Sequence, residues 1–315
     1  MEDPLLSSSP GAVAQRGDPK ATHQGQLCGT AEGVRVWCIK TSVAGIILVT
    51  LVWLALGGGV CLAAWVSWTA QGLPPHQQWV HTALYTLLSA MALWSHARTA
   101  FSDPGAVPKG AQPILDTDAV EEMKQPRCSA CDAFKPPRAH HCRVCCRCIV
   151  RMDHHCPWMN NCIGLRTLKP FLLFLIYCCA TSLYALTLMV YYHLACKSCR
   201  FTSTGKALSA TLAAGGLAGF LFCVAMLISQ MHAIAAGMGT IDRMQAARRR
   251  QRLARAHHRR RTSRRQQHFL PLPWADIMGR GSKLLWLVPT LADLLPPEAC
   301  GYVLPKPLQG PGSLS

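Results

Sequence analysis

The chain has 315 residues, of which 50% are hydrophobic and only 15% charged, and its formal net charge is +17. An ordinary soluble domain carries about 25% charged residues. The composition excludes a disordered chain, which would contain few apolar residues, and argues against a plain soluble enzyme. Long apolar runs beside short basic segments are typical of a multi-span membrane protein.

Four apolar runs follow an N-terminal tail that is rich in Ser, Gly, Pro and Gln. They cover residues 42–68, 79–101, 171–195 and 207–238. Each run is long enough to cross a bilayer core of about 30 Å as a helix. Buried helices of a soluble protein are the alternative, but four such runs exceed what a soluble core needs. The sequence therefore predicts an all-α membrane protein with four transmembrane helices.

The basic residues between the runs predict the orientation of these helices. The first connection, residues 71–78, has no Lys or Arg, whereas ten lie between Lys109 and Lys169 and twelve between Arg243 and Arg280. Positive charge favours the cytosolic side, so both tails and the middle segment are expected to be cytosolic. We expect a flexible tail (1–41), helices 1 and 2 (42–101), a cysteine-rich domain (102–170), helices 3 and 4 (171–238) and a C-terminal tail with an Arg-rich segment (239–315).

The middle segment spaces its cysteines and histidines as zinc ligands are spaced. Zinc prefers four thiolate or imidazole ligands, often supplied by cysteines two residues apart. The ligands available are Cys128, Cys131, His141, Cys142, Cys145, Cys148, His155 and Cys162. They suffice for two zinc sites of three cysteines and one histidine each. Because the segment has few large apolar residues, we expect the two metal ions to serve as its core.

Asp153, His154 and Cys156 remain outside this set of eight, as do Cys146 and His140. A thiol, a base and a carboxylate that orients the base make up the arrangement of a nucleophilic triad. Cys156 would be the nucleophile, His154 the base and Asp153 the orienting carboxylate. The alternative is that all of these cysteines and histidines bind zinc and none is catalytic, and spacing alone leaves both readings open.

The segment resembles the cysteine-rich domain of the DHHC protein S-acyltransferases (palmitoyltransferases). The resemblance rests on the cysteine spacing together with Lys135-Pro136, Asp153-His154-His155-Cys156-Pro157-Trp158 and Asn160-Asn161-Cys162. Asp103-Pro104-Gly105 after the second apolar run also matches. Residues 102–110 and Trp286 are similar to the Golgi-type members, so a Golgi or endoplasmic reticulum membrane is expected. The resemblance covers roughly residues 40–290.

This resemblance implies a role for each matching residue. Cys128, Cys131, His141 and Cys148 would form one zinc site, and Cys142, Cys145, His155 and Cys162 the other. Cys156 would be acylated by a fatty acyl-CoA such as palmitoyl-CoA and would pass the acyl group to cysteines of membrane-associated substrate proteins. His154 and Asp153 would activate it. Homo-oligomers are left open.

The acyl-CoA substrate sets two further expectations. A C16 chain that is buried at about 0.8 kcal/mol per CH₂ gains more than about 10 kcal/mol of gross binding free energy, so an apolar slot among the helices is expected. Lys135 and Arg138, and more weakly Lys169, are the residues proposed to bind the CoA phosphates. A solvated basic loop is the alternative for these side chains.

Several positions differ from the family pattern. Thr167 stands where Asn is usual, Gly239-Thr240-Ile241-Asp242 where Thr-Thr-x-Glu is usual, and Pro273 where Asn is usual. These changes bear on turnover more than on fold, and a catalytically weak membrane scaffold is the alternative function. The Arg-rich segment 248–265 predicts attraction to anionic lipid. Nucleic-acid binding is the other reading of such a run, and we do not expect it here.

Overall fold

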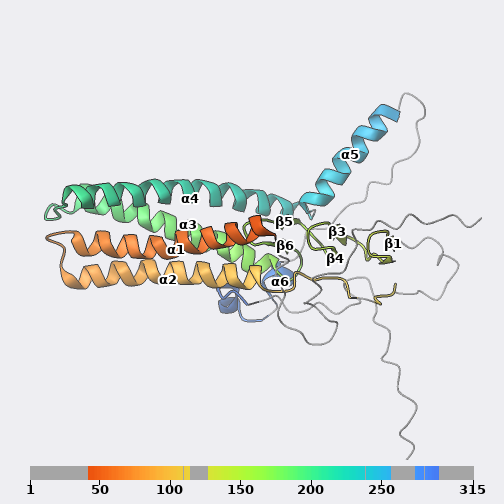
Figure 1. Cartoon of the computed structure of the whole chain (residues 1–315), viewed down its shortest axis with the longest axis horizontal. Coiled ribbons are helices and arrows are strands. Elements are labelled where there is room, and N and C mark those ends of the chain that lie inside the picture. The colour runs from red at the N-terminus through yellow and green to blue at the C-terminus, as the bar shows by residue number, and fades with distance from the viewer. Residues whose placement is uncertain are drawn as a thin grey trace, which may run out of the picture.

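A computed structural model describes residues 42–108, 110–113, 127–237, 239–256, 274–279 and 281–290. The expected tail 1–41, Pro273 and the second half of the Arg-rich segment (257–265) lie outside these residues. Four long helices lie side by side and form an elongated bundle, with a small cysteine-rich domain at one end (Figure 1). They are α1 (Val43–Thr69), α2 (Pro75–Ala100), α3 (Leu168–Val190) and α4 (Ser203–Ala235).

Local sequence explains where these helices begin. The Ser42 side chain accepts a hydrogen bond from the Gly45 N–H, and the Thr202 side chain accepts one from the Gly205 N–H. Both are N-caps that satisfy a free donor of the first helical turn. Pro75 occupies the first position of α2, where a missing N–H costs nothing. The last turn of α3 continues as the π-helix η2 (Tyr191–Ala195).

Three of the helices are long and apolar enough to cross a membrane: Val43–Thr69, Leu168–Ala195 and Ser203–Ala235. Many of their large apolar side chains are exposed, including Leu54 of α1 and Leu221 of α4. Such surfaces are normal in lipid and unfavourable in water. α2 is less apolar but packs along α1 and α3. The molecule is therefore mostly helical, with three membrane-capable helices and a cysteine-rich domain.

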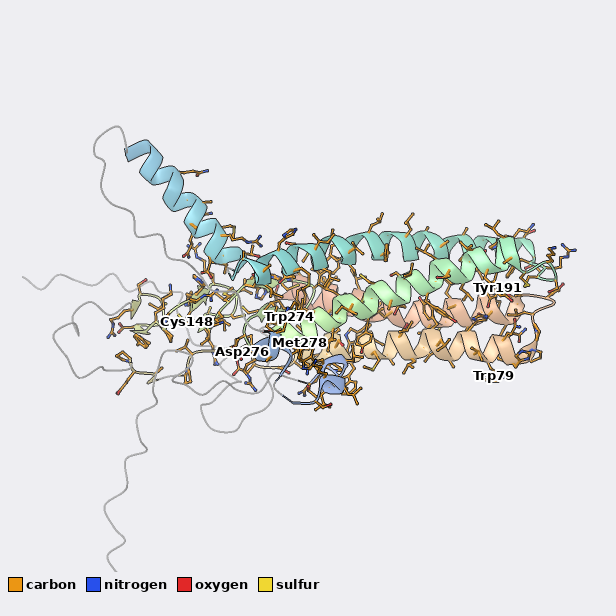
Figure 2. All side chains as sticks on the ribbon, turned by 180° about the vertical axis from the view of Figure 1, so that it is seen from behind. Trp79, Cys148, Tyr191, Trp274, Asp276 and Met278 are labelled. Carbon is orange, nitrogen blue, oxygen red and sulfur yellow. A yellow bond between two sulfur atoms is a disulfide. The ribbon has the colours of Figure 1, made fainter. Side chains whose placement is uncertain are left out.

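The connection between α3 and α4 contains a disulfide between Cys196 and Cys199. The same connection pairs with the α1–α2 turn, because Gln71 and Arg200 exchange backbone hydrogen bonds of 3.0 and 2.8 Å. In Figure 2, Trp79 and Tyr191 mark this end of the bundle, and Cys148 marks the cysteine-rich end. The disulfide and the free cysteines of the cysteine-rich domain thus lie at opposite ends of the molecule.

The cysteine-rich domain consists of three short antiparallel hairpins. Their strand pairs are β1 (Arg127–Cys128) with β2 (Ala133–Phe134), β3 (His140–Cys142) with β4 (Arg147–Ile149), and β5 (His154–Cys156) with β6 (Asn161–Ile163). After α4 the chain forms α5 (Thr240–Ala256), the short α6 (Trp274–Met278) and the 3₁₀ helix η3 (Lys283–Leu287). α6 packs on α3, close to the cysteine-rich domain (Figure 2).

Candidate functional site

Two clusters of cysteine and histidine side chains lie within the hairpins. The first contains Cys128, Cys131, His141 and Cys148, and the second contains Cys142, Cys145, His155 and Cys162. These are the same two sets that the family resemblance implies. In each cluster all ligand atoms lie within 4.8 Å of one another. Every cluster draws its residues from two neighbouring hairpins, so a bound ion would join the hairpins together.

Most of the distances fit a tetrahedral zinc ion. Zinc bonds of about 2.3 Å to sulfur and 2.0 Å to nitrogen place ligand atoms about 3.5–3.8 Å apart. In the first cluster, His141 Nδ1 is 3.6 Å from Cys128 Sγ and 3.1 Å from Cys131 Sγ. In the second, His155 Nδ1 lies 3.7, 3.5 and 3.6 Å from the sulfurs of Cys142, Cys145 and Cys162. Three thiolates and one imidazole form a closed donor set of the kind found in structural zinc sites.

The three hairpins repeat with a period of 14 residues. Cys128, Cys142 and Cys156 each end the first strand of a hairpin, and the last residue of each following turn has a positive φ: Asp132 (44°), Cys146 (52°) and Asn160 (46°). The first two hairpins place a second cysteine three residues after the first, at Cys131 and Cys145. The third hairpin has Met159 there. The third hairpin therefore lacks the second thiol of a zinc knuckle.

This difference accounts for the position of Cys156 outside both clusters in the described part of the chain. Successive side chains of a strand point to opposite faces. In β5, His155 therefore faces the second cluster, while His154 and Cys156 share the other face. Cys156 is 4% exposed and packs with Met159 and Phe171 in the core where the helices meet the hairpins. The family-implied nucleophile is thus held by a zinc-type hairpin without belonging to a cluster.

Asp153 is buried and accepts four hydrogen bonds. His154 Nδ1 donates to Oδ2 over 2.6 Å, and Gln230 Nε2, from the last turns of α4, donates to Oδ2 over 3.2 Å. Thr240, the first residue of α5, donates its backbone N–H to Oδ1 and its hydroxyl to Oδ2. Burial alone would raise the pKa of Asp153, but these donors and the charge of His154 outweigh it and lower the pKa to about 2. Asp153 is therefore an anion at neutral pH.

His154 connects this carboxylate to the thiol. Its ring packs edge-on against Phe171 at 5.7 Å, and its buried Nε2 has no hydrogen-bond partner among the described residues. Burial acts to lower the pKa of His154, but Asp153 and then Cys156 act in the other direction and raise it to about 9. Because Nδ1 is used by Asp153, Nε2 is the ring nitrogen that is left for chemistry at Cys156.

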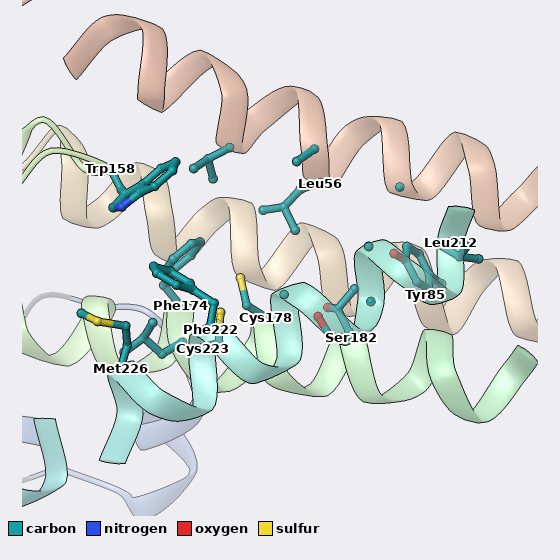
Figure 3. Close-up of a pocket in the computed structure, with 18 of the residues that line it drawn as sticks. Leu56, Tyr85, Trp158, Phe174, Cys178, Ser182, Leu212, Phe222, Cys223 and Met226 are labelled. Carbon is teal, nitrogen blue, oxygen red and sulfur yellow. The ribbon is translucent and has the colours of Figure 1, made fainter. Parts of the chain in front are cut away.

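An apolar cavity of about 550 Å³ begins at Cys156 and continues between the helices. Trp158 and Phe222 lie at the end near Cys156, and Tyr85 and Leu212 lie at the far end (Figure 3). The walls come mainly from α1, α3 and α4, and they include Leu56, Phe174 and Gly215. The cavity is the slot that an acyl chain attached to Cys156 would need.

The basic residues proposed for CoA binding have different environments. Lys135 is half-buried in the cysteine-rich domain. Arg138 donates Nη2 to the Gly237 carbonyl and lies 3.6 Å from the Asp242 carboxylate. Lys169 is 2% exposed, and its Nζ donates to the Leu285 carbonyl and to Thr290 Oγ1. Lys169, the weaker candidate for a CoA phosphate, therefore connects α3 to the C-terminal segment.

The positions that differ from the family pattern have defined contacts. The Thr167 hydroxyl donates to the Cys162 carbonyl over 3.0 Å and accepts from the Gly164 N–H. Asp242 accepts a 2.7 Å hydrogen bond from His140 Nε2. The shorter carboxylate of Asp242 therefore still reaches a partner. At Gly239, an added Cβ would lie 3.2 Å from Asp153 Oδ1. If threonine replaced Gly239, its side chain would crowd the Asp153 carboxylate, and one of the two would have to shift.

Sequence reasoning missed two buried polar side chains, Gln230 and His96. Both lie within apolar helices, where a polar residue that is nearly inaccessible needs a partner. Their burial could have been suspected from the sequence, but their partners could not, because Gln230 contacts a residue 77 positions away and His96 one 62 positions away. The Cys196–Cys199 disulfide was also not predicted.

Comparison with known proteins identifies the family. Residues 121–247 match the family model of the DHHC palmitoyltransferases. The chain is 34% identical over 225 residues to palmitoyltransferase ZDHHC7 of Rattus norvegicus, which covers 67% of this chain and 71% of that protein. It is 36% identical over 195 residues to human palmitoyltransferase ZDHHC3, covering 56% and 64% of the two chains. The probable protein S-acyltransferase 13 of Arabidopsis thaliana is 42% identical over 110 residues, which cover 30% of this chain and 36% of that protein.

The hairpins, the helices and these relatives define an acyltransferase with membrane-capable helices and a cysteine-rich domain whose two clusters could hold metal ions. The chain belongs to the DHHC palmitoyltransferase family. The resemblance drawn from residues 128–164 is thereby confirmed, as is the prediction that the protein is a protein S-acyltransferase.

Proposed function

We propose that Cys156 is the residue that carries the acyl group, in a two-step exchange. The observation that carries this proposal is that one buried thiol lies both beside the His154–Asp153 pair and at the mouth of the apolar cavity. The catalytic residues are Cys156, His154 and Asp153. Thioester exchange replaces one thioester by another, so each step is close to balanced in free energy.

In the first step the Cys156 thiol loses its proton to His154 Nε2, and its sulfur attacks the carbonyl carbon of a fatty acyl-CoA such as palmitoyl-CoA. The bond from that carbon to the CoA sulfur breaks, and CoA leaves as a thiol after taking up the proton. In the second step the thiol of a substrate protein gives its proton to His154 Nε2, and its sulfur attacks the carbonyl carbon of acyl-Cys156. The bond from that carbon to Cys156 Sγ breaks, and Cys156 takes up the proton. Asp153 keeps the Nδ1–H tautomer of His154 and stabilises the imidazolium that forms.

The two Cys/His clusters are proposed as structural zinc sites, with the ligands described above. Zinc at these sites would supply folding free energy and hold the hairpins together. Lys135 and Arg138 are proposed to approach the CoA phosphates. The Arg138 guanidinium also contacts the Gly237 carbonyl and the Asp242 carboxylate at the start of α5.

For the membrane we propose four transmembrane helices, with α2 as the fourth, and cytosolic termini and cysteine-rich domain, in a Golgi or endoplasmic reticulum membrane. The five segments keep the boundaries expected from the sequence. The Cys196–Cys199 disulfide supports this orientation, because disulfides persist in a lumen whereas zinc-binding thiolates suit the reducing cytosol. The partners proposed are fatty acyl-CoA, membrane-associated proteins with accessible cysteines, and anionic lipid at the Arg-rich tail.

The test uses the purified full chain in detergent with fluorescent palmitoyl-CoA. We expect hydroxylamine-sensitive label on the wild type, none on Cys156→Ser, and undiminished label on Cys146→Ser, an exposed cysteine of the same domain. Undiminished labelling of Cys156→Ser would overturn the assignment. Label that stays on Cys156 and does not pass to a substrate protein would favour the weak scaffold instead.

A further inference from the structure

His96 lies one turn before the end of α2 and is fully buried, and both of its ring nitrogens have partners. Trp53 Nε1 of α1 is 3.0 Å from His96 Nδ1, and His96 Nε2 is 3.0 Å from the backbone carbonyl oxygen of Trp158. The imidazole also packs edge-on against Phe174 of α3 at 5.3 Å. One histidine thus joins α1, α2 and the loop that follows Cys156.

The chemistry of the two partners fixes the proton on this ring. An indole N–H can only donate, so His96 Nδ1 must accept. A carbonyl can only accept, so Nε2 must carry the hydrogen and donate. A neutral imidazole in this single tautomer satisfies both contacts. Any side chain that cannot accept from Trp53 leaves its indole N–H without this partner, and one that cannot donate releases the Trp158 carbonyl.

Trp158 belongs to the turn of the β5–β6 hairpin, two residues after Cys156. The turn is closed by backbone hydrogen bonds from Met159 N to Cys156 O and from Asn160 N to Pro157 O. It is wedged against the helices on its other side, because a Cβ on Gly45 of α1 would lie 2.1 Å from Asn160 Oδ1. The backbone that carries Cys156 is therefore placed by the helices as well as by the second Cys/His cluster.

We propose that His96 is a positioning residue for Cys156, acting through the Trp158 carbonyl; this inference rests on the proposed role of Cys156 as the acylated thiol. The Cys/His cluster fixes the strands of the hairpin, and His96 fixes its turn at the mouth of the cavity. Together they hold the sulfur between His154 Nε2 and the acyl chain. A displacement of about 1 Å at a reacting atom can cost about 100-fold in rate.

The test compares acylation of the purified full chain by fluorescent palmitoyl-CoA for His96→Leu, His96→Gln and His96→Asn. The amide of Gln reaches about as far as Nε2 and can donate to the Trp158 carbonyl, whereas the amide of Asn lies near the position of Nδ1 and can only accept from Trp53. His76→Gln, at the exposed first turn of α2, is the matched control. Zinc content and melting temperature report whether the domain stays folded.

We expect His96→Leu and His96→Asn to lower the rate constant of acylation at least tenfold at saturating palmitoyl-CoA. KM and zinc content should stay near those of the wild type, and the melting temperature should fall by only the few degrees expected for the lost hydrogen bonds. His96→Gln should return to within threefold of the wild-type rate. A wild-type rate in His96→Leu, equal loss in the Gln and Leu variants, a change in KM alone, or loss of rate in step with loss of zinc would each overturn the proposal. Labelling of Cys156→Ser would instead overturn the proposed function, so the two failures are distinguishable.

Discussion

Thr240 donates its backbone N–H to Asp153 Oδ1 over 2.6 Å, and its hydroxyl donates to Oδ2 of the same carboxylate over 3.2 Å. These two residues are 87 positions apart, and they join the start of α5 to the turn that precedes β5. Gly239, just before Thr240, lies so close to Asp153 that an added Cβ would be 3.2 Å from Oδ1. The residue just before α5 is thus small where the chain passes the carboxylate that orients His154.

Gln230 provides a test of this carboxylate's surroundings. Gln230→Glu places a second acid 3.2 Å from Asp153 Oδ2. Like charges at this distance raise the pKa of one carboxyl, so Asp153 would hold His154 less firmly. We expect the rate of Cys156 acylation at pH 7 to fall about 10–100-fold, and Gln230→Leu, which removes one hydrogen bond worth about 1 kcal/mol, to cost about fivefold.

The measurement is the initial rate of labelling by fluorescent palmitoyl-CoA. Gln78→Leu is the matched control, because Gln78 Nε2 donates to the Leu73 carbonyl at the opposite end of the bundle. We expect the rate of this control to be unchanged. A wild-type rate in Gln230→Glu would show that the α4 contact does not influence the acylation step.

The hairpin ligands and the nucleophile could be predicted because their chemistry depends on local spacing. Two cysteines three positions apart share one knuckle, and His154 and Cys156 share one face of a strand whatever the rest of the chain does. The apolar runs could also be predicted as helices of bilayer length, because such a helix depends on composition over about 20 residues. Each of these features is contained in a short stretch of sequence.

Contacts between distant segments could not be predicted in this way. Nothing in the apolar run that contains Gln230 indicates Asp153 as its partner, and nothing near His96 indicates Trp158. Lys169 is a further example. A lysine beside a basic loop resembles a phosphate ligand, but this buried lysine donates to the Leu285 carbonyl, which lies more than 110 residues later in the chain.

Asp242 gives a second prediction, on stability. It accepts a 2.7 Å hydrogen bond from His140 and lies 3.6 Å from Arg138, so it joins α5 to the cysteine-rich domain. Asp242→Asn removes the charge from this contact and should lower stability by about 1–3 kcal/mol, seen as a lower melting temperature. Asp132→Asn is the control, since Asp132 pairs with Arg127 while 94% exposed, and exposed pairs contribute little.

The pH dependence of this difference follows from the pKa of Asp242. Burial alone would raise that pKa, but the hydrogen bond from His140 and the charge of Arg138 outweigh it and lower the pKa below its usual value. A lowered pKa gives stability that is complete above the unfolded value, about 4, and lost only as pH falls through the folded one. Because Asp242 stays ionised throughout this range, the difference in melting temperature between wild type and Asp242→Asn should not shrink as pH falls from 8 to 6. A difference that shrinks as pH falls from 8 to 6 would contradict this account.

The cavity gives the last prediction, on acyl-chain length. Gly215 of α4 lines the cavity and has open space where a Cβ would stand. Gly215→Leu should fill that space and exclude the far end of a long chain, while the mouth at Cys156 stays unchanged. We expect the rate with a C16 acyl-CoA to fall about tenfold and the rate with a C10 acyl-CoA to change less than twofold. Gly57→Leu is the matched control, because Gly57 also has open space but does not line the cavity. Equal loss with both chain lengths, or equal loss in the two variants, would show that the cavity does not hold the acyl chain.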